Sequence, residues 1–154
     1  MGSYFTYDFP IGPLTIGEEE GFITYLNFDD QEIKNYEKCE TNVLKDANRQ
    51  LHEYFSGTRK VFNLPLKYLS GTPFQQEVWD ALQEIPYGIT VSYKDIASKI
   101  KRPKAVRAVG GANNKNYIPI IIPCHRVIGA NGKLVGYGGG LDKKVFLLEL
   151  ERKH

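Results

Sequence analysis

The sequence predicts an α+β protein with a small β-sheet and one helix over residues 1–68, followed by a helical domain over residues 69–154 that contains a winged-helix-like helix-turn-helix. Three observations support this. Aromatic and β-branched residues alternate through residues 3–28, apolar residues recur at helical spacing from residue 41 onward, and the charge divides between the halves. Residues 1–68 carry seven Lys/Arg and eleven Asp/Glu, whereas residues 69–154 carry thirteen and seven. The basic second half is therefore the part expected to meet an anionic partner.

The first half reads as strands joined by tight turns. Residues 3–28 supply the strands, and Glu20-Gly21 fits a hairpin turn. A helix is expected over residues 41–57, capped by Thr41 or Asn42 and ended by Gly57. Residues 60–66 follow as a short edge strand, because Pro65 disfavours a central position. We expect this half to be structural.

The second half opens with two helices that carry clear start signals. Thr72 is expected to cap a helix that begins at Pro73, with Trp79 in the core. Ser92 and Asp95 are spaced as a capping box for a helix over residues 92–100. A sharp basic connection follows, and a third helix is expected to begin at Pro103. Two short helices joined in this way are typical of a helix-turn-helix.

The third helix carries an unusual face of small residues. At about 100° per residue, Val106 and Val109 share one side. Arg107 lies at the edge of another side that has almost no hydrogen-bonding groups. That side consists of Ala105, Ala108, Gly111 and Ala112. Close packing against another element would explain it, as would close approach to a DNA groove with little sequence readout.

A β-branched run over residues 118–122 predicts a buried strand that leads into Pro-Cys-His-Arg. Cys124 then follows a rigid proline, with His125 and Arg126 beside it. A thiol ionises near pH ~8.5, so a histidine that takes its proton would activate it as a nucleophile. A buried structural cysteine is the alternative. The chain is expected to end in a helix capped by Asp142, with Val145 and Leu148 buried.

Several protein classes fit the sequence poorly. No apolar run approaches the ~20 residues of a membrane helix, and the N-terminus does not resemble a secretion signal, so we expect a cytoplasmic protein without membrane contacts. Its two cysteines, Cys39 and Cys124, do not form a disulfide framework. No Cys-His spacing typical of zinc is present, so no metal site is expected.

Taken together, the segments RAVGGANNKN, IPIIIPCHRVIG and GYGGGLDKKVFLLELE closely resemble the O6-alkylguanine-DNA alkyltransferase family, also called methylated-DNA–protein-cysteine methyltransferases. The resemblance covers nearly all of residues 70–154, and the first half matches that family's ribonuclease-H-like domain only in layout. It implies a DNA repair protein that reverses damage directly in a single turnover. The partner would be duplex DNA containing O6-alkylguanine, and the protein would act as a monomer. Because the acceptor would be the protein's own cysteine, no cofactor would be needed. Activity on O4-alkylthymine stays open.

The resemblance also assigns roles to individual residues. Cys124 would accept the alkyl group, His125 would act as general base through a water, and Glu151 would orient that histidine. Asn116 would be a hinge between the DNA-binding helix and the cysteine segment. Tyr93 would crowd the phosphate of the flipped nucleotide and donate a proton to guanine. Arg126 is expected to form a structural ion pair.

The remaining assignments concern DNA and the substrate pocket. Arg107 resembles the family's arginine finger, which fills the stack that the flipped base leaves. Other DNA-facing residues would be Tyr93, Lys94, Arg102, Lys104, Ala105, Ala108 and Gly111. Backbone amides near Tyr137 and Gly138 would bind O6 of guanine. Tyr117 stands where relatives commonly have proline, which puts the width of the pocket in doubt.

Three other functions are each compatible with part of the sequence. An alkyltransferase-like module would hold alkylated DNA without repairing it, but such proteins lack the cysteine that Cys124 supplies. A helix-turn-helix regulator would read sequence, which the small-residue face does not favour. A thiol hydrolase would turn over more than once on an acyl or peptide substrate.

Overall fold

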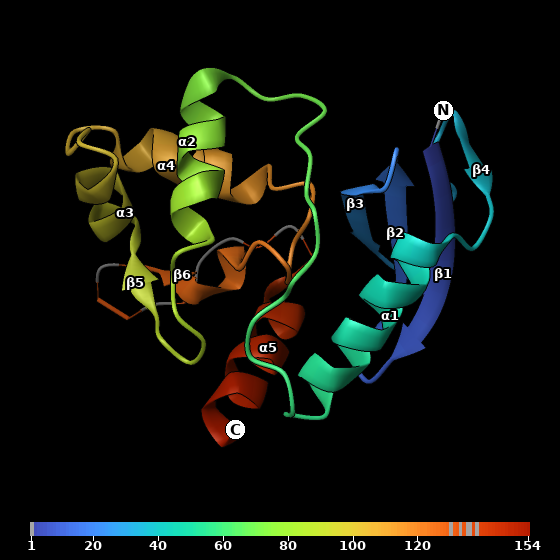
Figure 1. The fold of residues 1–154 in the computed structure, drawn as a ribbon. Coiled ribbons are helices and arrows are strands. Elements are labelled where there is room, and N and C mark those ends of the chain that lie inside the picture. The colour runs from blue at the N-terminus through green and yellow to red at the C-terminus, as the bar shows by residue number, and fades with distance from the viewer. Residues whose placement is uncertain (1, 130, 133, 135–136, 138) are drawn as a thin grey trace. The chain divides into compact units, whose positions relative to one another are not determined.

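The computed structural model describes residues 2–129, 131–132, 134, 137 and 139–154 (Figure 1). The chain forms two compact units, Met1–Leu69 and Ser70–His154. No helix in the described ranges is long and apolar enough to cross a membrane.

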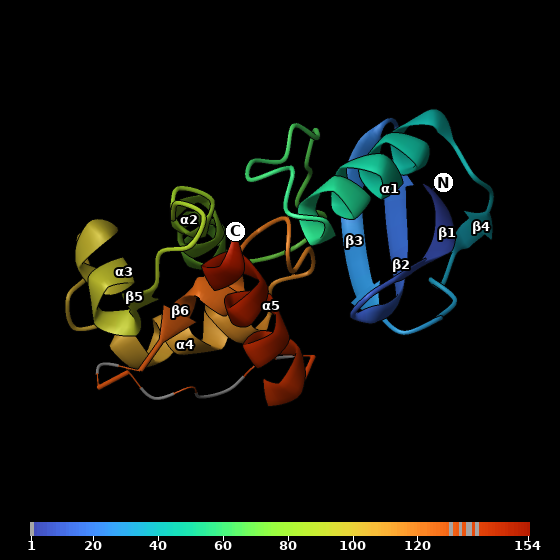
Figure 2. The same cartoon turned by 90° about the horizontal axis from the view of Figure 1, so that it is seen from below.

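In the first unit, four strands form a sheet in the order β3-β2-β1-β4, and helix α1 packs across one face of it (Figure 2). The elements are β1 (Gly2–Phe9), β2 (Gly12–Glu19), β3 (Phe22–Phe28), β4 (Tyr36–Lys38) and α1 (Asn42–Phe55). Strands β1, β2 and β3 are antiparallel, and β4 runs parallel to β1. Leu14, Ile16, Leu44 and Leu51 are fully buried, so the sheet and the helix supply one apolar core.

The ends of these elements follow the expected turn chemistry. Glu20 and Gly21 both have positive φ, 53° and 85°, as a tight hairpin between β2 and β3 requires. Thr41 precedes α1, but its side chain makes no capping hydrogen bond. Gly57 follows the helix with φ 84°, a left-handed conformation that glycine adopts without strain.

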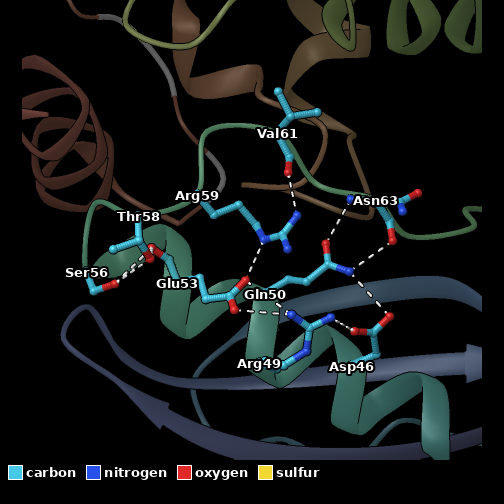
Figure 3. Close-up of polar contacts among 9 residues, drawn as sticks. All are labelled: Asp46, Arg49, Gln50, Glu53, Ser56, Thr58, Arg59, Val61 and Asn63. Carbon is cyan, nitrogen blue, oxygen red and sulfur yellow. Dashed lines mark hydrogen bonds and ion pairs between the residues drawn. The ribbon is translucent and has the colours of Figure 1, made fainter.

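The strand expected over residues 60–66 is wrong; only Leu66 forms an isolated bridge, with Ile23. A side chain takes the place of a neighbouring strand here (Figure 3). The amide of Gln50 donates to the Asn63 carbonyl at 2.9 Å and accepts from the Asn63 N–H at 2.8 Å. The backbone polar groups of Asn63 are thereby satisfied by helix α1, and Pro65 has no N–H to offer a ladder.

The described residues of the second unit form helices and one short parallel strand pair. Its elements are α2 (Pro73–Leu82), β5 (Val91–Ser92), α3 (Tyr93–Lys99), α4 (Val106–Asn114), the 3-10 turn Cys124–Arg126, β6 (Val127–Ile128) and α5 (Leu141–Lys153). Trp79 is 1% exposed, which confirms its place in the core, and its Nε1 donates to the Ala112 carbonyl of α4 at 2.9 Å. A Cβ at Gly71 would lie 2.6 Å from the Trp79 ring, so no larger residue fits there.

Both predicted caps of the second unit are confirmed. The Thr72 hydroxyl accepts from the Gln75 N–H at 3.1 Å, and the Gln75 side chain accepts from the Thr72 N–H at 3.0 Å. Ser92 and Asp95 make the same reciprocal pair at 3.0 and 2.9 Å. These capping boxes fix where α2 and α3 begin.

The helix-turn-helix is formed by α3 and α4, which pack together (Figure 1). The start predicted for the third helix at Pro103 is wrong, because α4 begins at Val106. Lys101 has φ 63°, and the Ala105 N–H donates to the Arg102 carbonyl at 2.9 Å. Residues 101–105 therefore form a turn before the helix begins.

The strand predicted over residues 118–122 is also wrong. The segment is a buried turn in which the Ile122 N–H donates to the Ile118 carbonyl at 2.9 Å and Ile120 has φ 73°. Burial explains the apolar composition, but Pro119 and Pro123 cannot donate to a ladder. Residues 118–122 are all buried, so the run reflects the core and not a sheet.

The last helix is placed differently from the prediction. Asp142 lies inside its first turn and Gly140 occupies the capping position, so Asp142 is not the cap. Val145 is 42% exposed, whereas the buried residues are Lys144, Leu147 and Glu151. The apolar residues of this helix lie on all its sides, so their spacing alone does not identify the buried face. That face carries two charged residues, Lys144 and Glu151, which have partners in the interior.

Candidate active site

Cys124 lies at the start of the 3-10 turn, directly after the buried turn of residues 118–122, and is 4% exposed. Two asparagines hold this backbone. Asn116 Nδ2 donates to the Ile122 carbonyl at 2.8 Å and its Oδ1 accepts from the Ile118 N–H at 2.9 Å. Asn113 Nδ2 lies 3.4 Å from the Cys124 carbonyl. The backbone that carries the sulfur is therefore tied to helix α4 and to the connection that follows it.

His125 and Glu151 form a fully buried pair. His125 Nε2 lies 2.6 Å from Glu151 Oε2, and the two side chains are 0% and 1% exposed. The other imidazole nitrogen, Nδ1, is buried and has no hydrogen-bond partner among the described residues. A neutral imidazole that donates through Nε2 presents Nδ1 as a proton acceptor.

Arg126 completes this cluster. Its Nε donates to Glu151 Oε1 at 2.8 Å and its Nη2 donates to Oε2 at 3.0 Å. Burial opposes ionisation of Glu151, but hydrogen bonds from His125 and Arg126 outweigh burial and hold its pKa well below the usual range. The expected ion pair of Arg126 is present in this arrangement.

The ionisation of the thiol differs from what the neighbouring imidazole suggested. Burial raises the pKa of Cys124 to about 11. Hydrogen bonding by Asn116 and Tyr137 and the charge of Lys144 lower this pKa, but by less than burial raises it. At neutral pH the resting sulfur is therefore a thiol, and its proton must leave during the reaction.

The expected pocket residues are only partly gathered around the sulfur. The side chains of Asn116, Tyr137 and Tyr93 all interact with Cys124. Burial, and next the charge of Cys124, raise the pKa of Tyr93, so its hydroxyl stays protonated. Tyr117 is 41% exposed and packs edge-on to Trp79, with 5.8 Å between ring centroids. Gly138 lies outside the described residues.

Lys144 is a functional candidate that the sequence analysis missed. Its side chain is fully buried and Nζ donates to the Val127 carbonyl at 2.6 Å. Burial lowers its pKa, and the charge of Cys124 raises it. A signal was present in the sequence. Lys144 and Glu151 stand seven residues apart and share one face of a helix with Leu147, and charged residues on a buried face need a reason.

The expected DNA-facing residues lie on the outside of the helix-turn-helix. Lys94, Lys104, Arg107, Ala108 and Gly111 are exposed, and Ala105 is half-buried. A Cβ at Gly111 would meet nothing within 4 Å. Ala112, in contrast, faces the core and does not belong to this face.

Arg102 already has partners within the protein. Its guanidinium forms an exposed ion pair with Glu77 at 3.2 Å and lies 5.9 Å from the centre of the Phe74 ring. A phosphate contact by Arg102 would have to compete with this pair.

No cluster of three or more His, Cys, Asp or Glu side chains that could hold a metal ion occurs in the described part of the chain. Cys39 is an exposed free cysteine and Cys124 a buried one. His125 follows Cys124 in the chain, and a neutral imidazole held by a carboxylate through Nε2 can accept a proton at Nδ1.

Comparison with known proteins now adds to this geometry. Residues 3–68 match the family model of the 6-O-methylguanine DNA methyltransferase ribonuclease-like domain, and residues 73–153 match that of the DNA binding domain. The chain belongs to the O6-methylguanine DNA methyltransferase family. The matches cover both halves, including the first, where the sequence resembled the family only in layout.

Two relatives of this family illustrate the similarity. The chain is 51% identical to the constitutive methylated-DNA–protein-cysteine methyltransferase of Bacillus subtilis, an alignment that covers 99% of this chain and 96% of the relative. It is also 51% identical to the methylated-DNA–protein-cysteine methyltransferase of Methanosarcina acetivorans, with 96% and 97% covered.

Solved structures of O6-methylguanine DNA methyltransferases share the fold. A Mycobacterium tuberculosis member crystallised in complex with DNA superimposes with a TM-score of 0.91 at 48% identity, covering 98% of this chain and 93% of that one. A Methanococcus jannaschii member gives 0.70 at 31% identity, with 97% and 93% covered. The predicted α+β fold, with a ribonuclease-like first part and a DNA-binding second part, is confirmed.

Proposed function

We propose that this protein repairs alkylated duplex DNA by direct reversal, moving the alkyl group from O6 of guanine to Sγ of Cys124. The observation that carries the proposal is the buried arrangement of the thiol beside an imidazole whose Nε2 is bound to Glu151 and whose Nδ1 is unused by the described residues. Family membership and the similarity to a member crystallised with DNA support the same function.

The proposed reaction balances without a cofactor. His125 Nδ1 takes the thiol proton, through a water where the two atoms do not meet directly. The thiolate attacks the alkyl carbon, so that an S–C bond forms as the C–O6 bond breaks and its electron pair goes to the guanine. The guanine then takes up one proton, for which the protonated Tyr93 hydroxyl is a candidate donor.

Access to O6 requires that the nucleotide leave the base stack, at a cost of a few kcal/mol. Helix α4 supports this step because its exposed small residues permit close approach and Arg107 projects from its first turn. Tyr93 links this helix to the sulfur, since a Cβ at Gly110 would lie 3.9 Å from the Tyr93 ring and that side chain also interacts with Cys124.

The product is a thioether, in which no carbon is activated toward water. Each molecule therefore reacts once. The acidic first unit contains no described group that the reaction uses, so we assign it a structural role. The reaction needs a free thiol, and we place the protein in a reducing compartment such as the cytoplasm.

The test is a mass measurement. Incubation with a duplex containing O6-methylguanine should add one methyl group, about 14 Da by the mass of CH₂, to the tryptic peptide that contains Cys124. The Cys124→Ser variant should bind the duplex and take up none, whereas Cys39→Ser should behave as the unmodified protein. Transfer that persists in Cys124→Ser, or repeated turnover, would contradict the proposal.

A further inference from the structure

Arg126 directly follows His125 in the 3-10 turn, and both side chains point to the same carboxylate. Both residues are buried, at 0% and 6% exposure. A 3-10 helix has three residues per turn, so the side chain of Cys124 points in a different direction from those of His125 and Arg126 at the level of the backbone. The chain thus places an acceptor thiol, a base and a fixed cation in three consecutive positions.

The oxygens of Glu151 are fully used. Oε1 accepts from Arg126 Nε at 2.8 Å and from the Gly88 N–H at 3.2 Å. Oε2 accepts from His125 Nε2 at 2.6 Å and from Arg126 Nη2 at 3.0 Å. Two carboxylate oxygens offer about four lone-pair sites, and four donors occupy them.

The guanidinium is itself held from the other side. Arg126 Nη1 donates to the Ile85 carbonyl at 2.7 Å, and the group lies 5.7 Å from the centre of the Tyr87 ring. These contacts hold the guanidinium against the carboxylate. The positive charge of Arg126 therefore offsets part of the attraction that Glu151 exerts on a protonated His125.

With a neutral His125, the cluster of Arg126, Glu151 and His125 has a net charge of zero. A proton on Nδ1 would leave one uncompensated positive charge in a buried site, which is unfavourable. The other ionisable groups that face this region are Cys124 on the same turn, Lys144 from α5, Tyr93 from α3 and Tyr87 from the connection before β5. None of them supplies a second resting negative charge.

We infer that Arg126 is a positioning residue that, by sharing the Glu151 carboxylate, keeps His125 uncharged with Nδ1 as its proton acceptor. The inference rests on the proposed function for its consequence, but not for its geometry. The electrostatics agree: burial lowers the pKa of His125, Glu151 opposes the shift, and the charges of Arg126 and Lys144 reinforce it. Without Arg126, the carboxylate would favour an imidazolium and the base would be blocked.

The first measurement needs no variant of Arg126. Nitrogen-15 NMR of the imidazoles in the unmodified protein should show His125 neutral at pH 7, with its proton on Nε2. The sequence has only three histidines, and His52→Gln and His154→Gln assign the other two. An imidazolium at position 125 at pH 7, or a proton on Nδ1, would overturn the inference even if every Arg126 variant failed to fold.

The second measurement removes the cation. In Arg126→Met the NMR titration of His125 should move up by about 1 pH unit, because an adjacent cation is lost and Glu151 is freed. The acidic limb of the methyl-transfer rate should move up by the same amount. Arg126→Lys keeps the charge and should titrate close to the unmodified protein. Arg152→Met, which breaks an exposed ion pair with Glu149, controls for net charge and should change neither readout.

The pH dependence of stability provides an independent readout. In the unmodified protein, the lowered pKa of His125 means that the unfolded state binds more protons, so its contribution to stability is lost as pH falls below about 6.5. In Arg126→Met the pKa of His125 should rise toward its unfolded value, so the loss of stability at low pH should become smaller. A folded Arg126→Met with the unmodified titration and pH–rate profile would refute the inference. An unmodified protein that fails to methylate Cys124 refutes the proposed function instead.

Discussion

Two glutamates on two helices make similar contacts in different surroundings. Glu53 of α1 accepts from Arg49 at 3.1 Å and Arg59 at 2.8 Å (Figure 3), and Glu151 of α5 accepts from His125 and Arg126. The Glu53 side chain is 37% exposed and that of Glu151 is 1% exposed. Water can replace a lost partner at Glu53 but not at Glu151. Burial therefore decides whether the same ion-pair chemistry is dispensable.

The largest effect is expected from Glu151→Gln. The amide cannot accept from four donors, so one charged partner is left uncompensated inside the protein. We expect a loss of about 3 kcal/mol in the free energy of unfolding, measured by denaturant titration, and a fall of ~100-fold in the methyl-transfer rate. A folded variant with an unchanged transfer rate would remove the carboxylate from the proposed mechanism.

An exposed residue can break the simple rule that burial decides importance. Arg107→Ala should leave the melting temperature unchanged but slow transfer from duplex DNA by at least ~10-fold, because support for the flipped nucleotide is lost. Transfer from the free alkylated base should change little. The matched control is Lys115→Ala, an exposed cation just beyond the end of α4. Equal losses on duplex and free base would contradict the role given to Arg107.

Lys144 is a buried cation, and replacing it tests whether a buried charge acts on the reaction. The charge of Lys144 lowers the pKa of Cys124, so Lys144→Met should make the thiol harder to deprotonate and slow transfer by ~5-fold. Single-turnover rates measured between pH 6 and pH 9 report this change. Lys143→Met, one residue earlier on the same helix, should leave the rate unchanged. A loss of the same size in both variants would point to a general effect of helix charge.

The smallest effect is expected at the exposed ion pairs of Glu53 with Arg49 and Arg59. Glu53→Gln should lower the melting temperature by less than about 3 °C, because exposed ion pairs on a surface contribute little. The difference should shrink further in 1 M salt, which screens such pairs. Calorimetry at low and high salt measures both. A drop comparable to that of Glu151→Gln would mean that contacts, and not burial, set the contribution.

Sequence reasoning succeeded where a local signal has one meaning. The capping residues Thr72 and Ser92 and the Glu20-Gly21 turn each satisfy specific backbone groups, and each was found as predicted. The resemblance of the Pro-Cys-His-Arg segment identified the family. The pairing of His125 with Glu151 was expected from that resemblance, and the structure has it at 2.6 Å.

Sequence reasoning failed where one pattern is compatible with two different structures. The apolar run of residues 118–122 is equally consistent with a strand and with a buried turn, and only the hydrogen bonds of Asn116 and the prolines distinguish them. Lys144 was missed because a lysine is ordinarily exposed. The sharing of Glu151 between three groups depends on residues 88, 125 and 126 meeting in space, which no local pattern encodes.

The protein also carries its own reference thiol. Cys39 is open to solvent, whereas Cys124 is shielded and holds its proton more tightly than a free thiol. A small diffusing electrophile should therefore mark Cys39 first, while a lesion delivered by DNA should mark Cys124. The ratio of alkylated Cys39 to alkylated Cys124 in one protein therefore separates two contributions to selectivity: presentation of the alkyl group by DNA, and the inherent nucleophilicity of each thiol.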